Sequence, residues 1–107
     1  MDLHRLAEER SLAYHREVAA LLCAHPELLE GVRVRLAGWL AEGRSAHHAA
    51  AWLALVDGPR AHLLALLVDE GEQARELRQS TPFSGLIEPR RRWRIWREVR
   101  ERLEEAP

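Results

Sequence analysis

Apolar residues recur at helical spacing along nearly the whole chain, and prolines and glycines interrupt the pattern between segments. In the first segment, one sector at about 100° per residue contains Leu3, Leu6, Ala7, Tyr14, Val18, Leu21 and Leu22. The strict alternation of apolar and polar residues that marks a β-strand is absent. The sequence therefore predicts an all-α fold without strands.

The interruptions divide the chain into five or six expected helices. Asp2 can cap the first helix, and Pro26 and Pro89 suit the first turns of two others. The expected helices span residues 2–24, 26–42, 46–56, 60–68, 69–79 and 89–105. A chain of 107 residues can bury one core without a metal or a disulfide. Residues 1–107 should therefore form a single compact bundle, with the two apolar central helices as its buried hairpin.

The first helix has a second apolar side. Leu12, Ala19 and Cys23 lie nearly opposite the main apolar sector. A helix with two apolar faces usually packs between two neighbours, and otherwise lends one face to a partner. We favour the first arrangement, and Leu12 is a candidate contact residue under the second.

Large apolar residues are concentrated in the segment that precedes the last helix. Residues 82–87 contain Phe83, Leu86 and Ile87 around Ser84 and Gly85. Leaving so many large apolar side chains in water would be unfavourable. We expect this segment to pack against the domain.

The last helix combines tryptophans with arginines. The core-facing arc expected around Trp96 is completed by Trp93, Ile95, Val99 and Leu103. Arg92 and Arg100 fall in the same arc, four residues on either side of Trp96, and can reach its indole.

The first turn of the last helix contains Arg90, Arg91 and Arg92, although the helix dipole is already positive there and favours acids. Such departures from local rules are common at functional sites. These arginines would favour an anion, either a phosphate or an acidic patch on a partner. The simpler alternative is that acids of the preceding helix fold back onto them, namely Glu70, Glu72 and Glu76.

No set of residues points to catalysis or metal binding. His47 and His48 are adjacent on a helix and therefore point about 100° apart. Cys23 is the only cysteine, so a paired-cysteine zinc motif is impossible. Metalloprotease, phosphate-loop and serine-hydrolase motifs are absent. We expect no enzyme activity, cofactor, metal site or small-molecule substrate.

Composition argues for a cytoplasmic protein. The formal net charge of −1 is nearly neutral, which is unlike a strong polyanion binder. The single cysteine favours a reducing compartment. Charged helical sequence follows Met1 at once, without an apolar signal core, and no run approaches the ~20 apolar residues of a membrane span. We expect no membrane contact.

Binding to another macromolecule is the remaining function. Because Trp and Arg dominate interface hot spots, the leading hypothesis is a non-catalytic module that binds a protein partner or itself. The alternative is a nucleic-acid-binding regulator using the last helix, although the acids of that helix would face the phosphates. The expected contact residues are Arg90, Arg91, Arg92, Arg94, Arg97, Phe83, Leu86, Trp93 and Trp96, with Leu12 and Trp39 as lesser candidates.

Two stretches resemble a group of small helical bacterial proteins. The first is Arg10-Ser11-Leu12-Ala13-x-His15. The second is Leu77-Arg78-Gln79-Ser80-Thr81-Pro82-Phe83-Ser84-Gly85, followed by Pro89-x-x-x-Trp93. The resemblance implies an antitoxin-like small partner in a two-gene operon, beside a nucleotidyltransferase-type toxin. It implies no particular site residues.

Overall fold

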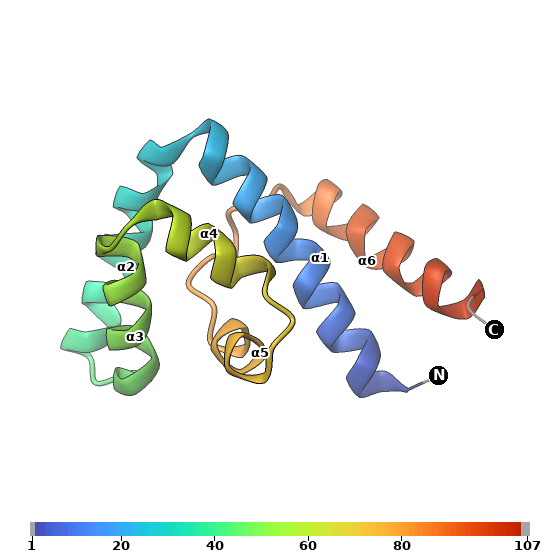
Figure 1. Cartoon of the computed structure of the whole chain (residues 1–107), viewed down its shortest axis with the longest axis horizontal. Coiled ribbons are helices and arrows are strands. Elements are labelled where there is room, and N and C mark those ends of the chain that lie inside the picture. Colours follow the sequence, from blue (N-terminus) through green and yellow to red (C-terminus); the bar gives the residue numbers. More distant parts are fainter. Residues whose placement is uncertain (1, 106–107) are drawn as a thin grey trace.

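The computed structural model describes residues 2–105, which contain helices, turns and no strand (Figure 1). The elements are α1 (Leu3–Ala24), the short 3-10 helix η1 (Pro26–Leu28), α2 (Leu29–Ala41), α3 (Ala46–Asp57), α4 (Arg60–Val68), α5 (Glu72–Gln79) and α6 (Pro89–Glu105). The all-α prediction is confirmed. The side chain of Asp2 caps α1 as expected, because its Oδ1 accepts from the backbone N–H groups of His4 (3.0 Å) and Arg5 (3.3 Å).

The long helix α1 is the centre of the arrangement (Figure 1). It contacts α6 on one side and α4 and α5 on the other, while α2 packs mainly on α3 at the far end. The expected buried hairpin of α3 and α4 is therefore not the hub of the fold. Several apolar residues on these two helices are only half-buried or exposed, including Leu64, Leu66 and Val68.

The second apolar face of α1 is buried at Leu12, whereas Ala19 is half-buried and Cys23 is exposed. Leu12 is only 4% exposed, within the same chain. The interpretation that α1 packs between two neighbours is thus confirmed, and Leu12 as a contact residue for a partner is wrong.

The larger of two hydrophobic clusters lies where α1, α2, α3, α4 and the segment before α6 meet. Its central contact is an edge-to-face pair of Trp52 and Phe83, with ring centroids 5.6 Å apart. The Trp52 indole N–H donates to the carbonyl of Leu77 (3.2 Å), so its one polar group is satisfied in the core. Trp39 packs on the edge of this cluster, half-buried, with the guanidinium of Arg44 5.0 Å from its ring centroid.

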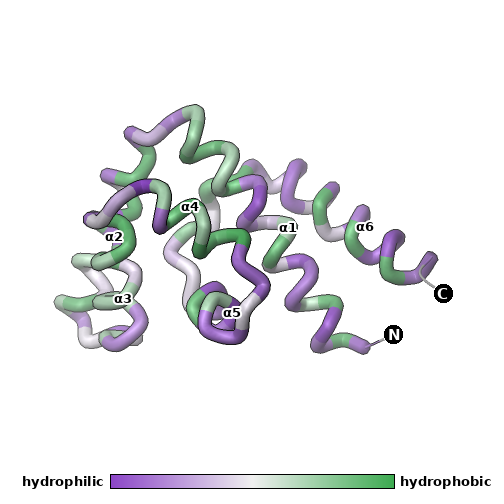
Figure 2. Tube along the Cα trace, in the orientation of Figure 1, coloured by the Kyte–Doolittle hydropathy of each residue, from purple (hydrophilic) through white to green (hydrophobic). Residues whose placement is uncertain are grey.

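The smaller cluster fixes α6 against α1. Its buried members are Leu6, Ile95 and Val99. Figure 2 shows the contrast between the mainly hydrophobic helices α2 to α4 and the largely hydrophilic α6. No helix in residues 2–105 combines the length and the apolar character needed to cross a membrane.

Candidate binding site on α1 and α6

The segment before α6 is held in place by side chains from two helices. The Tyr14 hydroxyl donates to the carbonyl of Phe83 (2.7 Å), and Arg35 donates to the carbonyls of Pro82 (3.0 Å) and Ser84 (2.8 Å). Gly85 has φ +83°, a conformation that favours glycine. The expectation that this segment packs against the domain is confirmed.

Two of the expected contact residues belong to this segment and are less available than expected. Phe83 is fully buried, so its assignment as a residue that contacts a partner is wrong. The short run of apolar residues there signalled core packing. Leu86 is half-buried and packs on the larger cluster.

His15 connects α1 to the same segment. Its Nδ1 lies 2.7 Å from the carbonyl of Ser11, which can only accept, so Nδ1 carries the proton. Nε2 therefore accepts from the hydroxyl of Thr81 (2.8 Å), whose oxygen in turn accepts from the backbone N–H of Phe83 (3.1 Å). The pKa of His15 is lowered to about 4, mainly by burial; the hydrogen bond to Ser11 opposes this shift, and the nearby charge of Arg78 adds to it. The imidazole is neutral at pH 7.

Arg78 is an enclosed cation at the end of α5. Its side chain is 4% exposed, and its Nη1 donates to three backbone carbonyls, those of Leu66 (3.3 Å), Leu67 (3.4 Å) and Asp69 (2.6 Å). It therefore adds hydrogen bonds to carbonyls around the C-terminus of α4, where the carbonyl of Leu66 also accepts from the backbone N–H of Asp69 (3.2 Å). Burial lowers the pKa of this guanidinium, and the charge of Asp69 partly opposes the shift. An arginine remains charged under such conditions.

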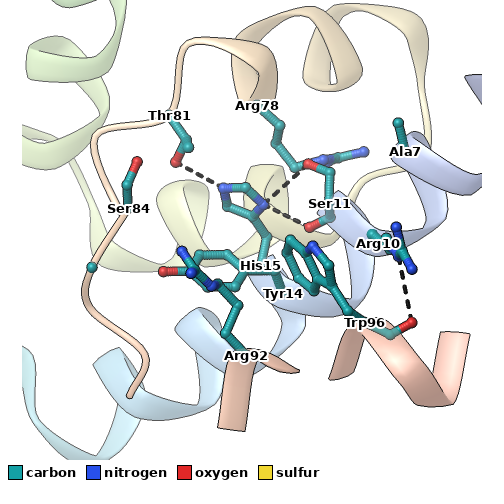
Figure 3. Close-up of a pocket in the computed structure, with 11 residues that line it drawn as sticks. Ala7, Arg10, Ser11, Tyr14, His15, Arg78, Thr81, Ser84, Arg92 and Trp96 are labelled. Atoms are coloured by element: carbon teal, nitrogen blue, oxygen red, sulfur yellow. Dashed lines mark hydrogen bonds between the residues drawn. The ribbon is translucent and has the colours of Figure 1, made fainter. Parts of the chain in front are cut away.

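A pocket of about 370 Å³ lies between α1, the end of α5, the segment before α6 and the start of α6. It is lined by Ala7, Arg10, Ser11, Tyr14, His15, Arg78, Thr81, Ser84, Gly85, Arg92 and Trp96. Figure 3 shows the side chains of Arg78 and Arg92 around His15, with Arg10 beside Trp96. Three arginines from three helices line the pocket, and no carboxylate of residues 2–105 does. We call it the arginine pocket.

A second hollow of about 460 Å³ adjoins the arginine pocket along α6. Arg10, Trp93, Trp96, Arg97 and Arg100 line it, so the two hollows share Arg10 and Trp96. The guanidinium carbon of Arg10 lies 5.9 Å from the Trp96 ring centroid, and its Nε donates to the Trp96 carbonyl (3.4 Å). Trp96 is half-buried and also meets Tyr14 edge-to-face at 5.9 Å.

The buried side of α6 is rotated away from the arc expected around Trp96. Ile95 and Val99 are buried, which centres the core-facing stripe near Val99, about 60° from Trp96. Trp93 lies on the other side of Trp96 and is 70% exposed, so its assignment to the core is wrong. Arg92 lies within about 20° of Val99 and is nevertheless exposed, because it borders the arginine pocket.

The arginines of α6 differ in their partners. Arg91 pairs with Glu17 of α1 and, at 3.9 Å, with Glu98 of its own helix. By contrast, no carboxylate oxygen of residues 2–105 lies within 4.0 Å of the guanidinium groups of Arg90, Arg92, Arg94 or Arg97.

The alternative that the α5 region neutralises these arginines is therefore wrong. Of its acids, Glu76 instead faces His48 at 3.7 Å. In the described part of the chain, no group of three or more His, Cys, Asp or Glu side chains is placed to hold a metal ion.

Comparison with protein-family models, curated proteins and solved structures gave no match. The resemblance based on the two stretches therefore stays a prediction. The structure does bring these stretches together, because Arg10, Ser11 and His15 from the first line the arginine pocket with Arg78 and Thr81 from the second. None of these five was expected from the sequence to be a site residue. The sequence feature that could have identified them is that they are polar residues within the two stretches.

Proposed function

We propose that this protein is a non-catalytic interaction module that docks an exposed stripe of α6 onto an acidic protein partner. The stripe, which we call the basic stripe, consists of Arg90, Trp93, Arg94 and Arg97. The observation that carries the proposal is Trp93, an indole that is 70% exposed among arginines with no acid from residues 2–105 within 4.0 Å.

The spacing of the basic stripe suits a helix that binds through one face. Positions 90, 93, 94 and 97 follow the i, i+3, i+4, i+7 pattern and are neighbours on the helix surface. Trp and Arg combine a large contact area with directional hydrogen bonds, which explains their enrichment at interface hot spots. A complementary partner would offer an apolar recess for Trp93, surrounded by carboxylates.

Electrostatics disfavours self-association through the same stripe. In a two-fold symmetric dimer a patch meets its own copy, so the arginines of one stripe would face those of the other. Like charges brought together in this way repel, most strongly where water is excluded. A second, acidic chain fits better, and the resemblance to antitoxin-like partners in two-gene operons supports it.

Nucleic acid is the weaker candidate for this stripe. Glu98, Glu101 and Glu104 follow it on the same helix and are exposed. A nucleic-acid backbone that ran along α6 would bring phosphates near these acids. A protein partner, by contrast, can present basic side chains opposite these acids.

The test is binding to the product of the neighbouring gene, measured by co-purification and by calorimetry with purified chains. Trp93→Ala should weaken the complex by about tenfold or more, as expected for a hot-spot residue. Val34→Ala is the matched control, since Val34 is also a large exposed apolar residue (64%) but lies on α2. Its effect should stay within about twofold.

The competing outcomes are distinct. Absence of a complex at micromolar concentrations would reject this partner, and equal losses in the two variants would reject the stripe. A salt-sensitive mobility shift with upstream DNA that Arg90→Ala/Arg94→Ala abolishes would favour nucleic acid instead.

A further inference from the structure

The arginine pocket contains more positive charge than the domain neutralises. Arg78 shows this best, because it is 4% exposed and its hydrogen-bond acceptors are all neutral carbonyls. Asp69, Glu70 and Glu8 are near enough to raise its pKa, but no carboxylate oxygen of residues 2–105 lies within 4.0 Å of it. Buried charges in proteins are normally paired. The counter-ion of this cation is therefore expected to come from outside residues 2–105.

Hydrogen-bond donors also remain free around the pocket. Within residues 2–105, Arg78 uses only Nη1, and its Nε and Nη2 donate to no protein atom. Every fully enclosed side-chain nitrogen or oxygen in this part of the chain has a partner. The unused donors of Arg78 must therefore be open to the arginine pocket or to a neighbouring hollow of about 230 Å³, which Glu8 and Arg75 also line. The Arg92 guanidinium and the Ser84 hydroxyl likewise make no hydrogen bond with residues 2–105.

The uncharged polar side chains of His15 and Thr81 in the pocket lining already form hydrogen bonds within the protein. His15 and Thr81 satisfy each other and two backbone groups, so neither is free to hold an anion. Their role is to fix the segment before α6 against α1, which sets the distance between the arginines on either side.

We propose that the arginine pocket binds the phosphate group of a small organic phosphate monoester, with Arg10, Arg78 and Arg92 as its counter-ions. A carboxylate presents two oxygens in one plane and is matched by one bidentate arginine. A phosphate monoester carries about −1.5 to −2 charges on three terminal oxygens that point in different directions. Guanidinium groups supplied by α1, α5 and α6 fit the second geometry better.

The size of the pocket indicates that the ligand is more than inorganic phosphate. A volume of about 370 Å³ falls in the range of small-molecule sites and exceeds what one phosphate group fills. The rest of the pocket opens past Trp96 toward the hollow bordered by Trp93. An apolar or planar group attached to the phosphate can stack on the indole of Trp96, which lines the pocket. This site does not depend on the basic stripe or on a protein partner.

Phosphate titration of the full chain, followed by nitrogen-15 NMR of the tryptophan indoles at constant ionic strength, tests the proposal. The Trp96 signal is assigned by Trp96→Phe. Inorganic phosphate should shift this signal saturably at millimolar concentrations, whereas acetate and chloride should not. Ribose 5-phosphate or adenosine 5′-monophosphate should bind about tenfold more tightly than inorganic phosphate, since the organic group adds apolar contacts. The comparison of these two compounds shows whether a planar base contributes.

Two neighbouring arginines provide a matched pair of variants. Arg90 and Arg92 both lie exposed in the first turn of α6 without a nearby carboxylate, but only Arg92 lines the pocket. Arg92→Ala should weaken phosphate binding by about tenfold or more, the value of a charged hydrogen bond. Arg90→Ala should change it by less than about twofold.

Several results would overturn the proposal. These are an unsaturable shift, equal losses in Arg90→Ala and Arg92→Ala, acetate binding as tight as phosphate binding, or organic phosphates that bind no better than inorganic phosphate. Arg78 is left unchanged, because its removal would also expose the carbonyls at the end of α4.

Discussion

The two ends of the molecule are attached to α1 in different ways. At one end, α2, α3 and α4 surround a large cluster in which Trp52 and Phe83 are fully buried. At the other end, α6 is held by a smaller cluster with the buried residues Leu6, Ile95 and Val99, by contacts of Trp96 with Tyr14 and Arg10, and by ion pairs at its surface. Since burial of apolar area supplies most of the folding free energy, the first end should determine stability. The surface of α6 is then free to serve binding.

The largest expected effect compares two tryptophans, one from each end. Trp52→Ala should destabilise the protein by about 3–5 kcal/mol through a cavity in the larger cluster. Trp93→Ala should change stability by less than about 0.5 kcal/mol, since it removes only surface contacts. Urea unfolding followed by circular dichroism measures both. Similar losses in the two variants would remove the basis of the comparison.

The second effect concerns His15, which lies between the two ends of the molecule and should make the stability of the protein depend on pH. Its pKa is about 4 when folded against 6.5 for the unfolded chain, so the unfolded state binds more protons between these values. The stability that the neutral His15 contributes is fully present above pH 6.5 and is lost as pH falls toward 4. It should amount to at most about 3 kcal/mol, roughly 1.4 kcal/mol per pH unit.

Two variants separate His15 from the carboxylates that titrate at lower pH. His15→Gln should flatten the stability profile between pH 6.5 and 4.5, while His62→Gln, at an exposed position of α4, should leave its slope unchanged. Unfolding curves at a series of pH values provide the measurement. An unchanged slope in His15→Gln would mean that His15 is protonated in the folded state.

The third effect concerns the smaller cluster alone. Ile95→Ala should cost about 2 kcal/mol, the low end for a buried isoleucine, because the cluster lies at the edge of the domain. The loss should be local, so backbone amides of α6 should exchange with solvent faster while those of α3 stay protected. Hydrogen exchange followed by NMR tests this. Uniform acceleration across both helices would show that the two ends unfold as one unit.

The helices themselves could be predicted from the sequence, because caps, prolines and apolar periodicity act locally. The packing of residues 82–87 against the domain and the two neighbours of α1 followed from the same patterns. Which helix is central could not be predicted, since apolarity alone does not say which surfaces meet. The rotation of α6 was misjudged because Trp93, one of the two tryptophans of the supposed core-facing arc, faces solvent.

The arginine pocket could not be predicted from the sequence, for a different reason. Arg78 is held by backbone carbonyls, which every residue has, so its partners leave no trace in the sequence. Arg91 finds its acid in Glu17, 74 positions away. Only the juxtaposition of α1, α5 and α6 shows which arginines are neutralised and which remain available.

The smallest expected effect tests whether ion pairs help to hold α6. The side chains of Arg91 and Glu17 are 41% and 32% exposed, so solvent screens their attraction. A double-mutant cycle of Arg91→Ala and Glu17→Ala should give a coupling energy of about 0.5 kcal/mol, which decreases in high salt. Arg100 and Glu104 form the matched control, since their pair lies within α6 and ties it to nothing. Its coupling should be no larger than about 0.3–0.5 kcal/mol. If the Arg91–Glu17 coupling exceeded about 1.5 kcal/mol, ion pairing would rival the smaller cluster in anchoring α6, and a charged partner could then compete for Arg91 and loosen the helix.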